Sequence, residues 1–325
     1  MADFRIEIAD AAAYAKFLTD NPPQDPFSLP AFLDTYEEIF SSDVELLSIV
    51  KKETPIAVCA LFVGKRFSQP IIRLMPVRTY DGVHFRGLEG SKNQKQEYEK
   101  LLSLQVLEEY LEKNFSFHQM VFQPGFADIR AFQWAGAKII PQYTYVVDIH
   151  KFSEDNYTKS LKEVLRTAEH SGLHRGKCSI EELTALQQLS YERHGRKPPV
   201  PTEKLNRVLN KLDSAGLLEI ACVRSGSDEI LAGLAALRTQ TGLYFYVSGI
   251  RLGRTEGEKG ASHFLYHEIL KSEKQSGRSF VDFCGANTPS INLFKSAFGP
   301  RLDVYFRVWR ANRPLTRLAS AVKKI

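Results

Sequence analysis

The order of predicted elements repeats once along the chain, and this repeat limits the possible folds more than any other feature. The first half predicts, in order, a helix over 96–113, a strand at 119–123, a short helix at 128–134 and a strand at 143–149. The second half predicts a helix over 261–275, a strand at 279–284, a short helix at 290–297 and a strand at 304–309. Gly136 and Gly299 follow the two short helices as C-caps, about half the chain apart.

The beginnings of the two halves also correspond. The first half predicts a helix over 30–40, then strands at 46–50 and 56–63. The second half predicts helices over 181–192 and 203–215, then strands at 217–223, 230–237 and 242–249. Ser179 and Glu182 form a capping box at the first of these helices.

This order predicts an α/β protein with two tandem domains, 1–150 and 151–325. Short turns join the early strands into antiparallel hairpins, whereas helical crossovers make the last strands nearly parallel. Each domain is therefore expected to have a mixed central sheet flanked by helices. A linking helix within 153–172 is expected to bury Leu161, Val164, Leu165 and Ala168. The tail, 310–325, is a candidate to pack back on the first domain.

Composition indicates an ordinary cytoplasmic protein. The N-terminus has no basic region followed by an apolar stretch, and no apolar run is long enough to span a bilayer. Four widely spaced cysteines indicate neither zinc nor a disulfide framework. The net charge of +5 comes from the tail after Arg301. A solvated helix face is the favoured interpretation there, opposite a stripe of Leu315, Leu318, Ala319 and Val322, while attraction to RNA or an anionic membrane is the alternative.

Three motifs resemble the FemABX family, in which the GNAT order is doubled. The most specific is Phe280–Gly285 followed by the run 294–299, Phe-Lys-Ser-Ala-Phe-Gly. The turn 76–82, with Tyr80 and Gly82, and the segment 128–148 support it. The resemblance covers nearly the whole chain and implies two GNAT-like domains and acyl transfer.

The family contains two kinds of enzyme. One transfers amino acids from aminoacyl-tRNA to the amino group of a peptidoglycan precursor, and the other resembles acyl-CoA-dependent N-acyltransferases. Phe32 stands here where the first kind has tryptophan, and Thr35 and Tyr36 stand where a lysine often follows. There is also no room for the long helical arm that some members use with tRNA. These departures argue against a peptidoglycan substrate.

A GNAT site needs a splayed strand, a phosphate-binding helix start and a proton acceptor. Strand 243–249 is the candidate strand, with Tyr244, Tyr246 and Ser248 on one face. The loop that follows resembles a loosened GNAT phosphate loop, and its candidate donor-binding residues are Arg254, Gly257, Lys259, Gly260 and Ala261. A flexible turn without a ligand is the alternative. In the first half, 86–95 lacks a tight helix start, so that half is expected to have lost donor binding and to serve as scaffold or acceptor platform.

Four residues are candidates for catalysis. By resemblance, Lys295 would bind a donor phosphate or the oxyanion, with a solvent-exposed lysine as the alternative. Asp282 is either a base or a structural acceptor. Tyr246 could protonate the leaving thiolate. His194 could be a base, although a helix C-terminus before Gly195 explains it as well.

The leading hypothesis is an N-acyltransferase in which an amine attacks an acyl-CoA donor directly. The amine is a small molecule or a peptide, and no tightly bound cofactor is expected. No metal is expected either, because His170/His174 and His263/His267 lack a clear third ligand. The alternatives are an aminoacyl-tRNA-dependent peptidyltransferase and a non-catalytic binding protein with the same fold.

Overall fold

The computed structural model describes residues 3–87, 93–126, 128–253 and 255–313. The chain divides into two compact units, Met1–Gln142 with Val304–Ile325, and Tyr143–Asp303. Strand β7 (Lys138–Asp148) leads from the first unit into the second, and β13 (Arg301–Ala311) leads back. The predicted stripe in the tail and the loop residues 88–92 and Arg254 lie outside the described residues.

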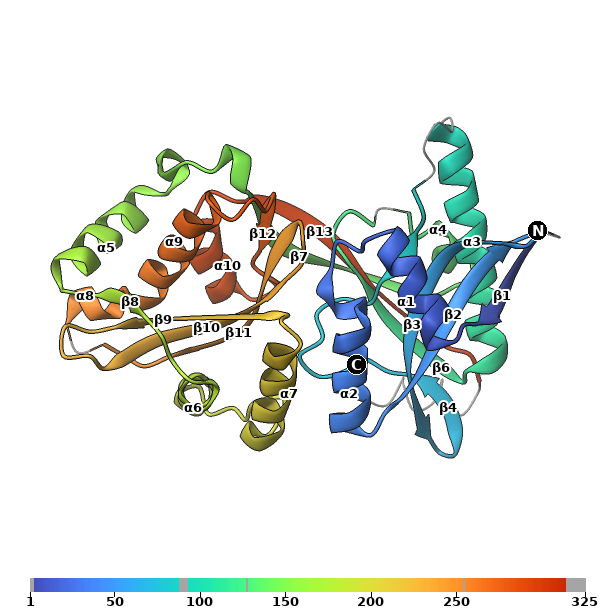
Figure 1. The fold of residues 1–325 in the computed structure, drawn as a ribbon, viewed down its shortest axis with the longest axis horizontal. Coiled ribbons are helices and arrows are strands. Elements are labelled where there is room, and N and C mark those ends of the chain that lie inside the picture. The colour runs from blue at the N-terminus through green and yellow to red at the C-terminus, as the bar shows by residue number, and fades with distance from the viewer. Residues whose placement is uncertain (1–2, 88–92, 127, 254, 314–325) are drawn as a thin grey trace. The chain divides into compact units, whose positions relative to one another are not determined.

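The first unit is a mixed sheet with helices on both faces. Its elements are β1 (Phe4–Ile8), α1 (Ala11–Asp20), η1 (Pro26–Ser28), α2 (Pro30–Phe40), β2 (Asp43–Lys51), β3 (Thr54–Arg66), β4 (Gln69–Ile72), β5 (Val83–Phe85), α3 (Asn93–Asn114), β6 (Phe117–Phe122) and α4 (Arg130–Trp134). The strand order is β1-β2-β3-β4-β6-β13, and β5 pairs with β3. Helices α1 and α2 lie on one face and α3 lies on the other (Figure 1).

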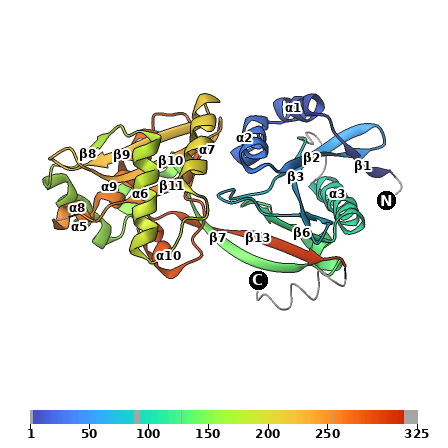
Figure 2. The ribbon, with the colours of Figure 1, turned by 90° about the horizontal axis from the view of Figure 1, so that it is seen from below.

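The second unit repeats this plan. Its elements after β7 are η2 (Ile149–Lys151), η3 (Glu154–Asn156), α5 (Lys159–His170), β8 (His174–Gly176), α6 (Ile180–Arg193), α7 (Thr202–Ser214), β9 (Leu218–Arg224), β10 (Ile230–Arg238), β11 (Gly242–Ile250), α8 (Glu256–Lys259), α9 (Ala261–Glu273), β12 (Phe280–Asp282) and α10 (Pro289–Ser296). The strand order is β7-β12-β11-β10-β9-β8. Figure 2 shows α6 and α7 over one face of these strands, with α5 and α9 on the other.

The predicted order of elements is confirmed in both halves of the chain, although the last strand of the second half, β13, belongs to the first unit. The capping signals lie where they were expected. The Ser179 hydroxyl and the Glu182 carboxylate make the reciprocal bonds of a capping box at α6. Gly136 and Gly299 have φ values of 81° and 66°, the left-handed conformation that ends a helix at glycine. No helix in the described part of the chain has both the length and the apolar character needed to cross a bilayer.

The sequence did not predict β1 and α1. Helix α1 starts at the N-cap Asp10, whose carboxylate accepts from the Ala13 N–H, but only Tyr14 and Leu18 on it are buried. Two buried residues give too weak a helical periodicity to recognise. Helix α5 was predicted, and it buries Leu161, Leu165 and Ala168 in the core of the second unit, with Val164 half-buried.

Candidate functional site

Strands β11 and β12 part in the middle of the second unit. β11 pairs with β10 from Leu243 to Ile250, but its parallel ladder with β12 ends at Tyr244. The β10–β11 register shifts so that Tyr246 is the extra residue of a β-bulge. A bulge bends its strand and increases the local twist, which accounts for the divergence at this point. The bulge also interrupts the alternation that was expected to place Tyr244, Tyr246 and Ser248 on one face.

A cavity of about 350 Å³ opens beside the second half of β11. This volume lies within the range of about 300–1,000 Å³ that is usual for small-molecule sites. Its walls come from β10, from the end of β11, from the first turns of α9 and from α10. Its basic side chains are Arg193, Lys259 and Lys295, and none of the described residues that line it is Asp or Glu. The cavity therefore suits a ligand with apolar and anionic parts.

Lys295, on α10, points its ammonium group at the loop after β12. Its Nζ donates to the carbonyl oxygens of Phe283 at 2.5 Å, Gly285 at 2.6 Å and Cys284 at 3.4 Å. Burial lowers the pKa of Lys295, while Cys284 and Asp282 nearby oppose the shift. Three carbonyls converge on one cation because Cys284 and Gly285 both have positive φ. Lys295 thus holds the shape of this loop while also lining the cavity.

Asp282, the last residue of β12, is buried and acts as a hydrogen-bond acceptor. Its Oδ1 accepts from the Thr144 hydroxyl at 2.6 Å and from the Cys284 N–H at 2.8 Å. The Thr144 hydroxyl oxygen in turn accepts from the Gly285 N–H at 3.0 Å. These bonds favour the structural role considered for Asp282 over the role of a base.

Gly257 and Gly260 are packing positions in the structure. A Cβ on Gly257 would collide with the Ser171 side chain at the end of α5, and one on Gly260 would lie 3.0 Å from Val164 and 3.3 Å from Ala168. These glycines let α8 and α9 approach α5 closely. Their expected role next to a phosphate stays a prediction.

The predicted site residues fall into two groups. Ser248, Lys259 and Lys295 line the cavity. The others that the structure describes are not among its lining residues: Asp282, Tyr246, His194, Gly257, Gly260 and Ala261. Ala261 is part of the hydrophobic core. His194 is exposed as the C-cap of α6, and Gly195 after it has a φ of 62°, as expected of a capping glycine.

Two consecutive residues that line the cavity were not predicted from the sequence to bind the donor. Ser262 and His263 lie in the first turn of α9 and line the cavity. The sequence indicated His263 only as a partner of His267 in a metal pair. In the structure the His267 ring instead hydrogen-bonds the Tyr157 hydroxyl at 3.2 Å. No group of three His, Cys, Asp or Glu side chains in the described chain is arranged to hold a metal ion.

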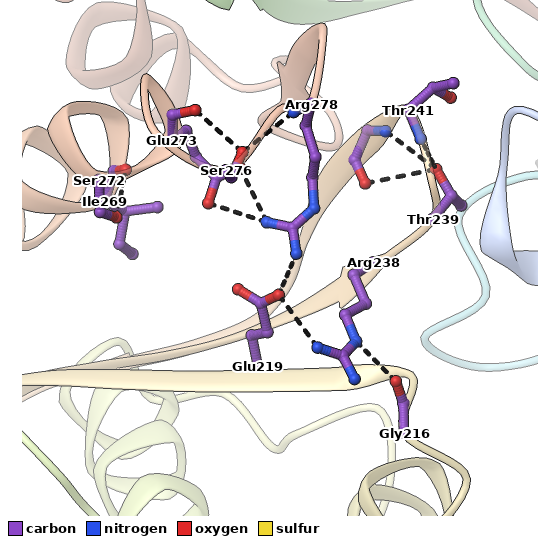
Figure 3. Close-up of polar contacts among 11 residues, drawn as sticks. Gly216, Glu219, Arg238, Thr239, Thr241, Ile269, Ser272, Glu273, Ser276 and Arg278 are labelled. Carbon is purple, nitrogen blue, oxygen red and sulfur yellow. Dashed lines mark hydrogen bonds and ion pairs between the residues drawn. The ribbon is translucent and has the colours of Figure 1, made fainter.

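The other end of α9 is held by a polar network (Figure 3). The Arg278 guanidinium donates to both carboxylate oxygens of Glu273, at 2.9 and 2.8 Å, and also binds Glu219 on β9. Arg238 on β10 lies 3.6 Å from the same Glu219 carboxylate. Because Glu273 ends α9, the network ties this helix to the sheet and thereby fixes where its first turn lies.

The first unit has a cavity of its own, of about 400 Å³. It lies between the end of β5, the start of α3 and the end of β6, the same position in the repeat as the cavity of the second unit. His84, Arg86 and Lys100 line it. The expected loss of donor binding in this half stays a prediction.

The described geometry agrees with comparisons to known proteins. Residues 155–295 match the family model of the acetyltransferase (GNAT) domain. FemX superposes with a TM-score of 0.68 at 12% identity, covering 97% of this chain and 99% of that chain. L-PGS from Bacillus licheniformis superposes with a TM-score of 0.59 at 16% identity, covering 98% and 97%. The second unit therefore contains a matched GNAT domain, and the chain as a whole has the tandem GNAT fold.

A tandem GNAT protein from the clavulanic acid biosynthesis pathway shares the doubled plan, with a TM-score of 0.51 at 8% identity over 96% of this chain and 98% of that one. At such low identities these likenesses show the fold. No curated protein matched the sequence. The doubled GNAT-like fold that the motifs indicated is confirmed, and the matched GNAT segment includes the cavity beside β11 up to Lys295.

Proposed function

We propose that the second unit transfers an acyl group from an acyl-CoA-like thioester to an amine. The observation that carries the proposal is the divergence of β11 from β12 at the bulge, with a cavity along the diverging part. Amide groups of an extended donor arm pair well with the backbone of a strand that has lost its neighbour. Arg193 and Lys259 supply positive charge for the donor phosphates.

The reaction would proceed by direct attack. The amine nitrogen bonds to the thioester carbonyl carbon, the carbonyl oxygen carries negative charge, and the C–S bond then breaks. The thiolate that leaves takes up the proton given up by the amine. Lys295 supports this step from a distance by shaping the loop 283–285.

Donor binding tests the proposal. A ligand that binds only the folded protein at 100 times its Kd adds about 2.7 kcal/mol to the free energy of unfolding. We expect acetyl-CoA to raise the melting temperature of the full chain, and free thiol to appear when amines such as L-lysine or glycylglycine are added. Absence of any shift with a series of CoA esters would contradict the thioester donor.

Aminoacyl-tRNA is the alternative donor. The fold shared with FemX and L-PGS supports this alternative, because the family that the motifs resemble includes aminoacyl transferases. Stabilisation by charged tRNA, without stabilisation by any CoA ester, would favour it. The sequence differs from the peptidoglycan-directed enzymes at Phe32, Thr35 and Tyr36. A peptidoglycan precursor is therefore the less favoured acceptor.

A further inference from the structure

The imidazole of His263 is a polar group in a partly aromatic part of the cavity wall. Its ring lies 4.6 Å from the Phe294 ring and 6.2 Å from the Phe298 ring, measured between centroids. Its Nδ1 is shielded from solvent and has no hydrogen-bond partner among the described residues. The neighbouring Ser262 hydroxyl is likewise buried and unpartnered within the described chain. Both residues line the cavity, and unpartnered polar atoms of lining residues indicate that a ligand completes their hydrogen bonds.

The surroundings keep the imidazole uncharged. Burial lowers the pKa of His263 below its ordinary 6.5. The ionisable groups that line the same cavity are Arg193 from α6, Lys259 from α8, Tyr266 from α9 and Lys295 from α10. Three of these are basic, and none is acidic. Lys259 itself pairs with Glu256.

We propose that His263 positions the donor, its uncharged imidazole forming a hydrogen bond with an amide of the donor's pantetheine arm. This inference rests on the proposed function of the second unit. An amide of this arm offers an N–H, from which the unprotonated Nδ1 of His263 can accept a hydrogen bond. A bare nucleotide with the same phosphates offers no amide in that part of the cavity. His263 would therefore select donors that carry an amide-bearing arm.

The test compares two ligands of the full-length protein by calorimetry, CoA and adenosine 3′-phosphate 5′-diphosphate, which has the nucleotide and phosphates of CoA without its arm. His263→Phe keeps an aromatic ring beside Phe294 and removes both nitrogens. We expect it to weaken CoA binding about tenfold and to leave nucleotide binding unchanged. His263→Asn places an amide near the position of Nδ1, and we expect it to keep CoA binding within about threefold of the native protein.

A matched control uses the other histidine of α9. His267 bonds to Tyr157 and does not line the cavity. His267→Phe should therefore leave the ratio of CoA affinity to nucleotide affinity unchanged, whatever it does to stability. Equal weakening of both ligands by His263→Phe, or no weakening of either, would overturn the role of His263.

Acidification gives a second readout. As the pH falls through the pKa of His263, which burial holds below its ordinary 6.5, the imidazole gains a proton and can no longer accept a hydrogen bond, so the CoA-to-nucleotide affinity ratio should fall further in the native protein than in His263→Phe. The terminal phosphate of the nucleotide gains a proton near neutral pH, whereas in CoA the same phosphate is esterified to the arm, so His263→Phe serves as the reference for this effect. A ratio that changes with pH equally in the native protein and in His263→Phe would overturn the proposal. If the native protein failed to bind CoA at all, the proposed donor would be refuted. If it bound CoA and His263→Phe bound CoA equally well, only the role of His263 would be refuted.

Discussion

At the scale of single residues, Lys295 and Asp282 bind backbone groups. Lys295 and Asp282 are the charged side chains in the run that resembles Fem-type enzymes, and both are buried. Their hydrogen bonds go to carbonyl and N–H groups of the loop after β12. Buried backbone groups need partners, and a loop with two consecutive positive-φ residues cannot find them in a regular ladder. The two side chains supply those partners.

Replacement of Lys295 tests this interpretation. Lys295→Met keeps the length of the side chain and leaves the carbonyls of Phe283 and Gly285 without their donor. We expect the free energy of unfolding to fall by about 3 kcal/mol, because hydrogen bonds to a charged group are worth about 1.5–3 kcal/mol each and part of the loss is relieved by water. Urea denaturation measures this.

Lys271→Met is the matched control, since Lys271 lies on α9 with half its side chain exposed and pairs with Glu268. It should change the free energy of unfolding by less than about 0.5 kcal/mol. Equal effects of the two substitutions would mean that the Lys295 bonds contribute little to stability.

At the scale of elements, the site depends on the divergence of two strands and on the close packing of three helices. The bulge at Tyr246 turns β11 away from β12 and opens the sheet. The glycines at 257 and 260 bring α8 and α9 against α5, which places the first turn of α9 beside the opened strand. Neither feature involves a residue that reacts, yet together they determine the position of the cavity wall.

Addition of one methyl group tests the close packing of α8 on α5. Gly257→Ala would drive a Cβ into the Ser171 side chain, so α8 must shift. We expect a loss of about 1–3 kcal/mol in the free energy of unfolding and weaker CoA binding. Ser171→Gly in the same chain should restore part of both.

Gly226→Ala is the control for that experiment, because a Cβ there would meet nothing closer than 3.9 Å. It should leave the melting temperature and the CoA affinity nearly unchanged. If Gly257→Ala behaved as Gly226→Ala does, close packing on α5 would not explain the glycine.

At the scale of the whole molecule, each unit has its own core. Leu104, Leu107 and Phe132 belong to the core of the first unit, and Leu234 and Leu270 belong to that of the second. Both tryptophans, Trp134 and Trp309, lie in the first unit. Tryptophan fluorescence therefore reports on the first unit, whereas circular dichroism reports on both.

This separation predicts different effects of one substitution on the two signals. Leu270→Ala should cost the second unit about 2–5 kcal/mol and lower the melting temperature seen by circular dichroism more than that seen by fluorescence. Leu107→Ala is the reciprocal variant and should lower the fluorescence transition. Identical shifts of both signals for both variants would show that the two units unfold as one cooperative body.

Local patterns were enough to predict the order of elements. The leucines of α3, the capping box of α6 and the glycines after α4 and α10 each act within a few residues, so the chain encodes them without reference to the rest of the fold. Elements with few buried residues, such as α1, left too little pattern to recognise. The repeat of the whole order then led to the doubled architecture.

The site itself was predicted only in part, for a physical reason. Ser248, Lys259 and Lys295 were expected from their places after a strand and in a motif, and they do line the cavity. The packing of Gly257 on Ser171 joins segments far apart in the sequence. The partners of Lys295 and the unpartnered nitrogen of His263 depend on how a loop and neighbouring elements pack. The sequence by itself determined which elements form and in what order, because helix periodicity and caps are local. Only the tertiary structure decided where β11 leaves β12 and which side chains face that opening, because both follow from packing between distant parts of the chain.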